Sequence, residues 1–159
     1  MHVFESAACV APRALAVLAL LAALPGAADA QRVRQVIDGD TITVSGVGVV
    51  RLIGVDAPEK MGGYRQSEPF GDAATAFMKR LLEGQIVTLE YDGPRKDQYN
   101  RTLAYVVLAD GRLANLEIIR AGLAETYRRF DYHRKPAFFA AEREVKEAKR
   151  GMWAVRRPQ

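Results

Sequence analysis

Two short apolar runs with carboxylates at their ends constrain the fold of this chain more than any other part of the sequence. They lie within residues 36–59 and are separated by a glycine-rich turn. The first run, Thr41–Ser45, is β-branched at every second residue, and the second, Val49–Val55, is apolar except for Arg51. Such runs favour β-strands. We therefore expect two adjacent strands with acidic residues at their ends.

The aspartates at these strand ends are candidate ligands of a cation. Asp40 precedes the first strand together with Asp38, and Asp56 closes the second. A single aspartate beside a turn most often serves the turn itself. Two carboxylates at the ends of neighbouring strands, however, repel each other unless a cation lies between them. Their oxygens suit Ca²⁺, which also accepts backbone carbonyls and water as ligands.

Two arginines and a glutamate complete the group of candidate functional residues. Arg51 interrupts an apolar strand, where its charge loses hydration unless it meets an anion. Arg101 opens a later strand, where it either faces a phosphate, whose oxygens match a guanidinium fork, or forms a salt bridge at the rim. Glu59 follows Pro58, whose fixed φ limits how the carboxylate is presented. Taken alone, Glu59 is typical of a solvated surface residue.

Periodicity along the rest of the chain predicts a small antiparallel β-barrel with helices. Strands are expected at 32–37, 41–45, 49–55, 86–91 and 101–108, and helices at 70–81, 116–121 and from residue 136, the second of them capped by Asn115. Five short strands with a helix between the third and the fourth suggest an OB-fold, a five-stranded Greek-key barrel. The predicted fold class is therefore mainly β with α (α+β), with about three helices capping the barrel.

Three segments of the sequence, DGDT, RLIGVDAPE and DQYNRTLAY, resemble the staphylococcal nuclease (thermonuclease) family. The resemblance extends from Arg32 to about Trp153 and implies the same OB-fold. It also implies that Ca²⁺ is bound by the carboxylates of Asp40 and Asp56 and by the backbone carbonyl of Ala57. The family often has threonine at position 57, but a backbone ligand tolerates that difference.

The same resemblance implies roles in the hydrolysis of a phosphodiester. Glu59 matches the general base that deprotonates the attacking water. Arg51 and Arg101 match the pair that stabilises charge on the phosphate. Tyr99 and Tyr127 match residues that shape the nucleotide site, Tyr127 by packing on the base, which tolerates any base sequence.

Two further features bear on contacts with a substrate. Gln98 stands where some members of the family carry a basic residue, so one contact to a substrate phosphate is expected to be absent. The segment 128–135 mixes four basic residues with aromatic ones. Such a mixture is typical either of a surface that tracks a nucleic-acid strand or of a solvated loop.

Residues 1–30 have the pattern of a secretory signal peptide. Arg13 precedes the apolar run Ala14–Leu24, and Ala28-Asp29-Ala30 provides an A-x-A cleavage site. An uncleaved membrane anchor is the alternative, but the run is too short for a bilayer core of ~30 Å. We therefore expect a nuclease domain at residues 31–159 that is exported to the periplasm or the medium as a monomer without stable membrane association.

Together these features predict an exported, Ca²⁺-dependent nuclease that hydrolyses phosphodiester bonds in DNA and RNA with little sequence specificity, leaving 3′-phosphate products. The formal net charge of +4 at pH 7 accords with a polyanionic substrate, although many proteins that do not bind nucleic acid carry as much charge. The main alternative is a nucleic-acid-binding module on the same OB-fold that has lost catalysis. Such a module would lack part of the acidic and arginine set, which is complete here.

Overall fold

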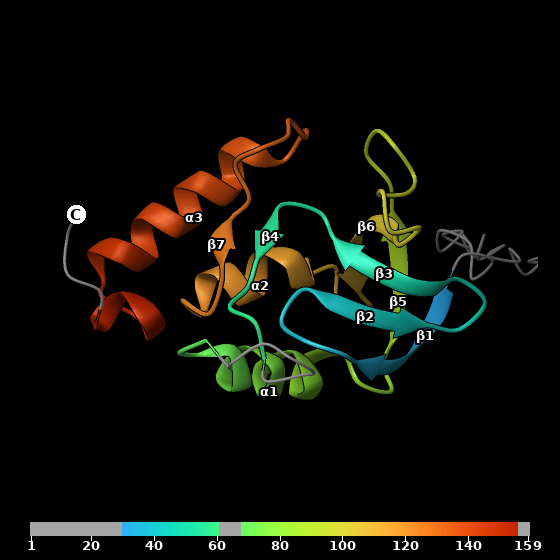
Figure 1. Ribbon diagram of the computed structural model, residues 1–159, viewed down its shortest axis with the longest axis horizontal. Coiled ribbons are helices and arrows are strands. Elements are labelled where there is room, and N and C mark those ends of the chain that lie inside the picture. Colours follow the sequence, from blue (N-terminus) through green and yellow to red (C-terminus); the bar gives the residue numbers. More distant parts are fainter. Residues whose placement is uncertain (1–29, 61–67, 156–159) are drawn as a thin grey trace, which may run out of the picture.

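The computed structural model describes residues 30–60 and 68–155, so the expected signal peptide lies outside the described residues except for its last position. Within these ranges the chain forms seven β-strands, three α-helices and a short 3₁₀ helix (Figure 1). The strands are β1 (Ala30–Val36), β2 (Thr41–Val44), β3 (Gly48–Leu52), β4 (Val55–Asp56), β5 (Ile86–Glu90), β6 (Thr102–Leu108) and β7 (Glu125–Thr126). The helices are α1 (Gly71–Leu82), α2 (Ala114–Arg120), α3 (Lys135–Glu147) and the 3₁₀ helix Gly151–Ala154.

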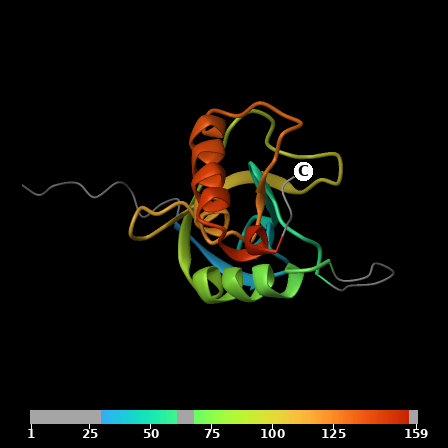
Figure 2. The same cartoon turned by 90° about the vertical axis from the view of Figure 1, so that its left-hand side faces the viewer.

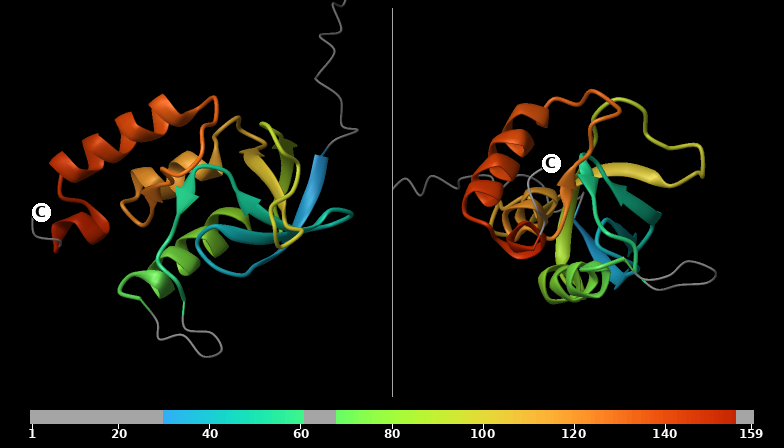
Figure 3. Two further views of the ribbon diagram at one scale, coloured as in Figure 1. Left: turned by 45° about the horizontal axis from the view of Figure 1, so that its top comes forward. Right: turned by 60° about the vertical axis from the view of Figure 1, so that its left-hand side comes forward.

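Five of the strands close into a barrel in the order β1-β2-β3-β6-β5, with β5 returning to pair with β1. Neighbouring strands are antiparallel except for β3 and β6, which run parallel. Helix α1 packs against β1 and α2, and α3 packs against α2 and β7, so the helices form a layer beside the barrel (Figure 1 and Figure 3). This arrangement confirms the predicted α+β OB-fold, a five-stranded barrel with three helices.

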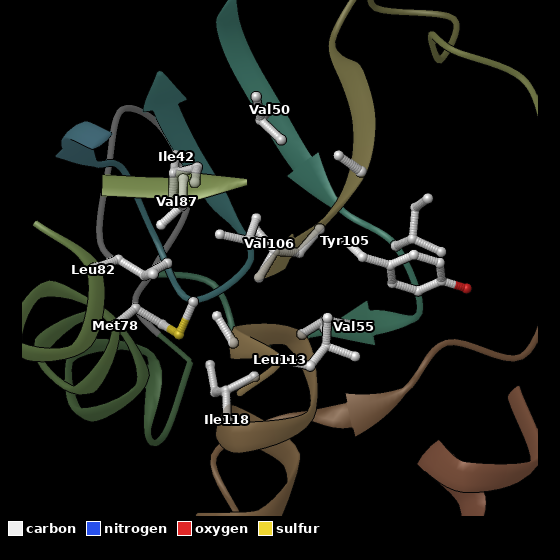
Figure 4. Close-up of a cluster of buried hydrophobic side chains, with 14 of the residues drawn as sticks. Ile42, Val50, Val55, Met78, Leu82, Val87, Tyr105, Val106, Leu113 and Ile118 are labelled. Atoms are coloured by element: carbon white, nitrogen blue, oxygen red, sulfur yellow. The ribbon is translucent and has the colours of Figure 1, made fainter. Parts of the chain in front are cut away.

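The barrel interior and the inner faces of the helices form one hydrophobic core. Figure 4 shows Ile42, Val50 and Val106, which come from three strands of the barrel, together with Met78 of α1 and Ile118 of α2. All five side chains are fully buried. Alternate residues of a strand point to the same face, and residues four apart on a helix share one side. The apolar periodicity of the sequence therefore becomes a single core that holds the helices against the barrel.

The second apolar run does not form one strand, as expected for residues 49–55, but breaks at Gly54. This residue has a φ of 77°, and a Cβ there would lie 2.6 Å from the ring of Phe138, so only glycine fits. Strand β3 belongs to the barrel sheet, where it pairs with β6. Strand β4 leaves that sheet and pairs with β7 instead. The break therefore moves Asp56 out of the barrel sheet while Arg51 remains in it.

Asn115 is not the helix cap that its position predicted. Helix α2 begins at Ala114, two residues before the expected start, with Leu113 at the N-cap. Asn115 is fully buried instead, and its Oδ1 accepts a hydrogen bond from the backbone N–H of Val106 at 2.8 Å. Its Nδ2 donates to the carbonyls of Ile53 at 2.9 Å and Ala104 at 3.3 Å. These bonds fasten α2 to β6 and to the chain segment between β3 and β4.

Replacing Asn115 by alanine should lower the free energy of unfolding by about 2–4 kcal/mol, because several buried backbone groups lose their partners at once. Urea denaturation followed by circular dichroism measures the change. Gln35→Ala, at an exposed position of β1, is a suitable control and should change stability by less than about 0.5 kcal/mol. An Asn115→Ala protein as stable as the wild type would show that these hydrogen bonds contribute little.

Candidate active site

Asp40 is held in a buried position at the end of the turn before β2, where the residue is 3% exposed. Its backbone N–H donates to Oδ1 of Asp38 at 3.0 Å, and its carbonyl accepts the N–H of Leu52 at 2.8 Å. Gly39 allows a neighbouring segment to close over this turn, because a Cβ there would lie 2.5 Å from the Cβ of Ala57. The backbone therefore fixes Asp40 beside β3 and beside the chain that follows β4.

The carboxylate of Asp40 interacts with three donor groups. Arg51 forms an ion pair with Oδ1, which also accepts a hydrogen bond from the hydroxyl of Thr41 at 3.0 Å. Oδ2 accepts the backbone N–H of Ala57 at 3.0 Å. The structure thus brings together three of the residues singled out in the sequence, namely Asp40, Arg51 and Ala57.

Arg51 lies at the centre of the charged groups, with a side chain that is 19% exposed. Its Nη2 donates to the carbonyl of Val55 at 3.3 Å and lies 3.9 Å from Oδ1 of Asp56. Burial lowers the pKa of Arg51, and the neighbouring charge of Arg101 lowers that pKa further. Three carboxylates, those of Asp38, Asp56 and Glu59, act in the opposite direction without cancelling the lowered pKa. Arg51 is therefore the point where the acidic residues and the second arginine meet.

Glu59 is exposed, but its backbone is fixed on both sides. Its N–H donates to Oε2 of Glu68 at 3.2 Å, and its carbonyl accepts the N–H of Glu68 at 2.9 Å. Gly71, the first residue of α1, packs against the same carbonyl, since a Cβ there would lie 2.2 Å from that oxygen. Glu59 is therefore anchored to the start of α1 within electrostatic range of Arg51.

Arg101 is presented by a tight turn between β5 and β6. Asn100 has a φ of 63°, in the left-handed region that asparagine tolerates. Oδ1 of Asp97 accepts the backbone N–H groups of Tyr99 and Arg101, each at 2.9 Å, and Oδ2 accepts Nε of Arg101 at 2.7 Å. Burial raises the pKa of Asp97, but these hydrogen bonds outweigh burial and the pKa is lowered. Arg101 therefore does form a salt bridge, and Asp97, which the sequence analysis did not single out, orients it.

A cavity of about 690 Å³ opens between the β5–β6 loop and the β7–α3 loop. Four of the residues predicted to act in catalysis or substrate binding line it, namely Arg51, Tyr99, Arg101 and Tyr127. The ring of Tyr99 is 5.3 Å from the guanidinium carbon of Arg101, and Tyr99 is 69% exposed. Tyr127 is half-buried, and its N–H donates to the carbonyl of Gly54 at 3.0 Å. The break between β3 and β4 therefore forms the floor of the cavity.

The predicted acidic residues do not line this cavity. Asp40 and Asp56 lie beside Arg51, and Glu59 is close enough to influence its pKa, but none of the three is among the residues that line the cavity. Arg51 therefore lies between these three acidic residues and a cavity whose lining combines aromatic and basic side chains with Asp92, Asp97 and Asp131.

Asp92 ties the two loops together at the wall of the cavity. Its Oδ2 accepts the hydroxyl of Tyr105 and the backbone N–H of His133, both at 2.7 Å, and its Oδ1 lies 2.6 Å from Nδ1 of His133. Burial raises the pKa of Asp92, but these hydrogen bonds outweigh burial and the pKa is lowered. Sequence reasoning missed Asp92 because its partners lie far away in the chain and carry no local signal.

The basic and aromatic segment 128–135 is committed mostly to structural contacts. Arg128 pairs at 3.0 Å with Glu142, a buried residue of α3. Arg134 pairs with Glu90 at the end of β5. Part of the segment is therefore held by structural ion pairs, while Arg129 and Phe130 line the cavity.

The oxygen atoms around Arg51 are of the kind that a hard divalent cation prefers, although those of Asp40 already accept bonds from Arg51, Thr41 and Ala57. Asp40 and Asp56 both present carboxylate oxygens to the same guanidinium, so their negative charges already converge. Such oxygens, completed by a backbone carbonyl and water, suit Ca²⁺. Residues 30–60 and 68–155 hold no group of three or more His, Cys, Asp or Glu side chains arranged to bind a metal ion. A cation there would rely on two carboxylates at most.

Comparison with known proteins identifies the family. The family model described as staphylococcal nuclease homologue matches residues 49–155. The thermonuclease of Staphylococcus hyicus is 39% identical over 127 residues, which cover 77% of this chain and 75% of that protein. The thermonuclease of Staphylococcus intermedius is 48% identical over 95 residues, which cover 58% of this chain and 56% of that protein. This chain belongs to the staphylococcal nuclease family.

Membership of the staphylococcal nuclease family supports a hydrolase that acts on nucleic acid. An uncharacterized endonuclease of Escherichia coli O157:H7 is a further relative, 38% identical over 126 residues that cover 77% of this chain and 76% of that protein. The range matched by the family model includes Arg51, Glu59 and Arg101, whereas Asp40 precedes it. Among the described residues, no helix is long and apolar enough to cross a membrane.

Asp38 provides a test of the charge balance at this nuclease site. Burial raises the pKa of Asp38 above its ordinary value of 3.8, against smaller opposing effects of Thr41 and Arg51. The folded state therefore holds this proton more tightly than the unfolded state, and stability falls as the pH rises from 3.8 through the raised pKa. Without divalent cations, Asp38→Asn should be more stable than the wild type at neutral pH, because asparagine keeps the acceptor oxygen without the charge.

Thermal melts of both proteins over a range of pH check this expectation. The difference in stability should disappear below pH 3.8, where the carboxyl group is protonated in both states. A wild type that is at least as stable as Asp38→Asn at neutral pH would contradict it.

Proposed function

We propose that this chain is an exported, Ca²⁺-dependent nuclease that hydrolyses phosphodiester bonds of DNA and RNA with little sequence specificity, leaving a 3′-phosphate and a 5′-hydroxyl. One observation carries the proposal: Arg51 and Arg101 line the same cavity, while Arg51 also contacts Asp40 and lies near Asp56. Groups that suit a phosphate and groups that suit a cation therefore meet at one residue. The exposed ring of Tyr99 accords with low sequence specificity, because stacking accepts any base.

Arg51 and Arg101 are assigned to the phosphate. Hydrolysis places negative charge on the equatorial oxygens, and a guanidinium fork donates to two of them at once. Both side chains are partly withdrawn from water, with exposures of 19% and 31%. Hydrogen bonds made there are stronger than in bulk water and need little reorganisation.

Glu59 is assigned as the general base. Its carboxylate accepts a proton from a water molecule, whose oxygen attacks phosphorus opposite the 5′-oxygen. The bond from phosphorus to that oxygen breaks, the 5′-oxygen takes a proton from solvent to become a hydroxyl, and the phosphate stays on the 3′-oxygen. The bonds between the backbone of Glu59 and Glu68 support a fixed presentation of the base. Such a base contributes ~10²–10⁴-fold to the rate.

Asp40, Asp56 and the backbone carbonyl of Ala57 are the groups that would hold Ca²⁺. When bound, the ion supplies positive charge next to the phosphate and makes a water molecule more acidic. The convergence of both carboxylates on one guanidinium supports this assignment. Few protein ligands imply weak binding, with a dissociation constant of roughly 10⁻⁴–10⁻³ M.

Hydrolysis assays with and without Ca²⁺ test the proposal. Purified protein should cleave labelled single- and double-stranded DNA and RNA in Ca²⁺, release fragments with 3′-phosphates, and lose this activity in EDTA. Undiminished cleavage in EDTA would exclude the metal requirement. Binding of nucleic acid without cleavage in Ca²⁺ would favour the inactive binding module instead.

Arg51→Lys and Arg101→Lys should each lower kcat by about 10²–10³-fold, because a lysine keeps the charge but cannot span two phosphate oxygens as a planar fork does. KM should change less, since contacts away from the scissile phosphate remain. Steady-state kinetics at saturating Ca²⁺ measure both constants. Lysine variants with near wild-type kcat would reduce these arginines to structural ion pairs.

Export and a monomeric state are parts of the same proposal. The A-x-A pattern at Ala28-Asp29-Ala30 supports cleavage before Gln31. N-terminal sequencing of the protein recovered from periplasm or medium should therefore begin at Gln31. A full-length protein in the membrane fraction would favour the anchor instead.

A further inference from the structure

Four cationic side chains line the cavity, and the mechanism proposed above uses only two of them. Three aspartates line it as well, and each already has a partner: Asp92 bonds to Tyr105 and His133, Asp97 to Arg101 and Asp131 to Lys135. Arg51 and Arg101 are each paired with an aspartate. Lys96 and Arg129 have no carboxylate partner within residues 30–60 and 68–155. Unpaired cations that line a concave surface attract anions, because the field is focused there.

Lys96 and Arg129 stand on opposite walls of the cavity. Lys96 belongs to the β5–β6 loop and Arg129 to the β7–α3 loop, and both loops rise at the same end of the molecule (Figure 2). Asp92 joins the two loops through His133, which restricts their separation. Each wall also carries an aromatic side chain that is 69% exposed, Tyr99 on one and Phe130 on the other.

The chain segment between β3 and β4 lies between these loops (Figure 1) and provides the floor with Arg51. Lys96 is positioned on its wall by a hydrogen bond of 2.8 Å from Nζ to Oδ1 of Asn100, a neutral partner that leaves the positive charge uncompensated.

We propose that Lys96 and Arg129 bind the phosphates on either side of the scissile phosphodiester, which lies between them at Arg51 and Arg101. The inference rests on the proposed function and names its substrate more closely: an internal stretch of single-stranded nucleic acid. The exposed rings on the two walls stack only on bases that are not paired with another strand. A nucleotide at a chain end would leave one of the two cations without a phosphate.

Charge-removing variants with matched controls test this inference. Lys96→Gln and Arg129→Gln each remove one cavity cation. Arg95→Gln and Arg143→Gln remove the same charge elsewhere, because Arg95 stacks on Tyr91 at 3.8 Å and Arg143 is exposed on α3. Fluorescence anisotropy in EDTA gives Kd at several salt concentrations for a single-stranded oligonucleotide and for a dinucleotide that has only the scissile phosphodiester. Assays in Ca²⁺ give kcat and KM for the oligonucleotide.

Lys96→Gln and Arg129→Gln should each raise Kd and KM for the oligonucleotide several-fold and change kcat much less. Each should also reduce the slope of log Kd against log salt concentration by about 0.7, the contribution of one phosphate contact on a single strand. Both variants should weaken oligonucleotide binding more than dinucleotide binding. Lys96→Arg should restore the slope because it keeps the charge, and the two control variants should retain the wild-type slope.

Two results would overturn the inference while the wild type still cleaves nucleic acid in Ca²⁺. One is an equal loss of affinity for the oligonucleotide and the dinucleotide. The other is a salt slope in Lys96→Gln and Arg129→Gln that matches the slope of the controls. Reduced slopes in a protein whose wild type cleaves nothing would instead support these phosphate contacts and overturn the proposed hydrolysis.

Discussion

The ion pair between Arg51 and Asp40 is the interaction on which the rest of the site depends. Their side chains are only 19% and 5% exposed, so either group alone would be a poorly hydrated charge without a counterion. The pair joins the turn before β2 to β3. Through the carbonyl of Val55 and the carboxylate of Asp56, Arg51 also reaches β4. The barrel and the separate β4–β7 pair therefore meet at a single guanidinium.

The same guanidinium supports the fold and, under the proposed function, binds the substrate. Arg51 loses most of its hydration when the protein folds. Binding a phosphate therefore does not carry the further cost of removing this cation from water. Arg101 has a comparable arrangement with Asp97, which engages Nε and orients the group. Both arginines are oriented before a substrate arrives. This preorganisation is what electrostatic stabilisation of a transition state requires.

Much of the fold and of the charged centre could be predicted from the sequence, because the residues involved lie on consecutive strands. Asp40 and Arg51 are brought together by β2 and β3, whose pairing follows from one glycine-rich turn. The break at Gly54 could not be predicted, since its cause is the ring of Phe138 from a helix much later in the chain. Asn115 was misread for the same reason: its local position suggests a cap, but its hydrogen-bond partners lie in other elements. Local sequence patterns therefore predict which strands and helices form. Where a strand or helix begins and ends depends on contacts with residues that are distant in the sequence.

The position of Asp40, Asp56 and Glu59 outside the cavity suggests a direction for the proposed reaction. Asp40, Asp56 and Glu59 do not line the cavity, which holds the exposed rings and the unpaired cations. A phosphodiester bound by Arg51 and Arg101 therefore has its nucleotides in the cavity and its phosphorus at the boundary. Under the proposed function, water activated by Glu59 would reach phosphorus from the side of Asp40 and Asp56, and the leaving oxygen would stay with its nucleotide on the cavity side. In-line displacement requires the attacking and leaving oxygens on opposite sides of phosphorus, and this separation of the carboxylates from the cavity supports that geometry.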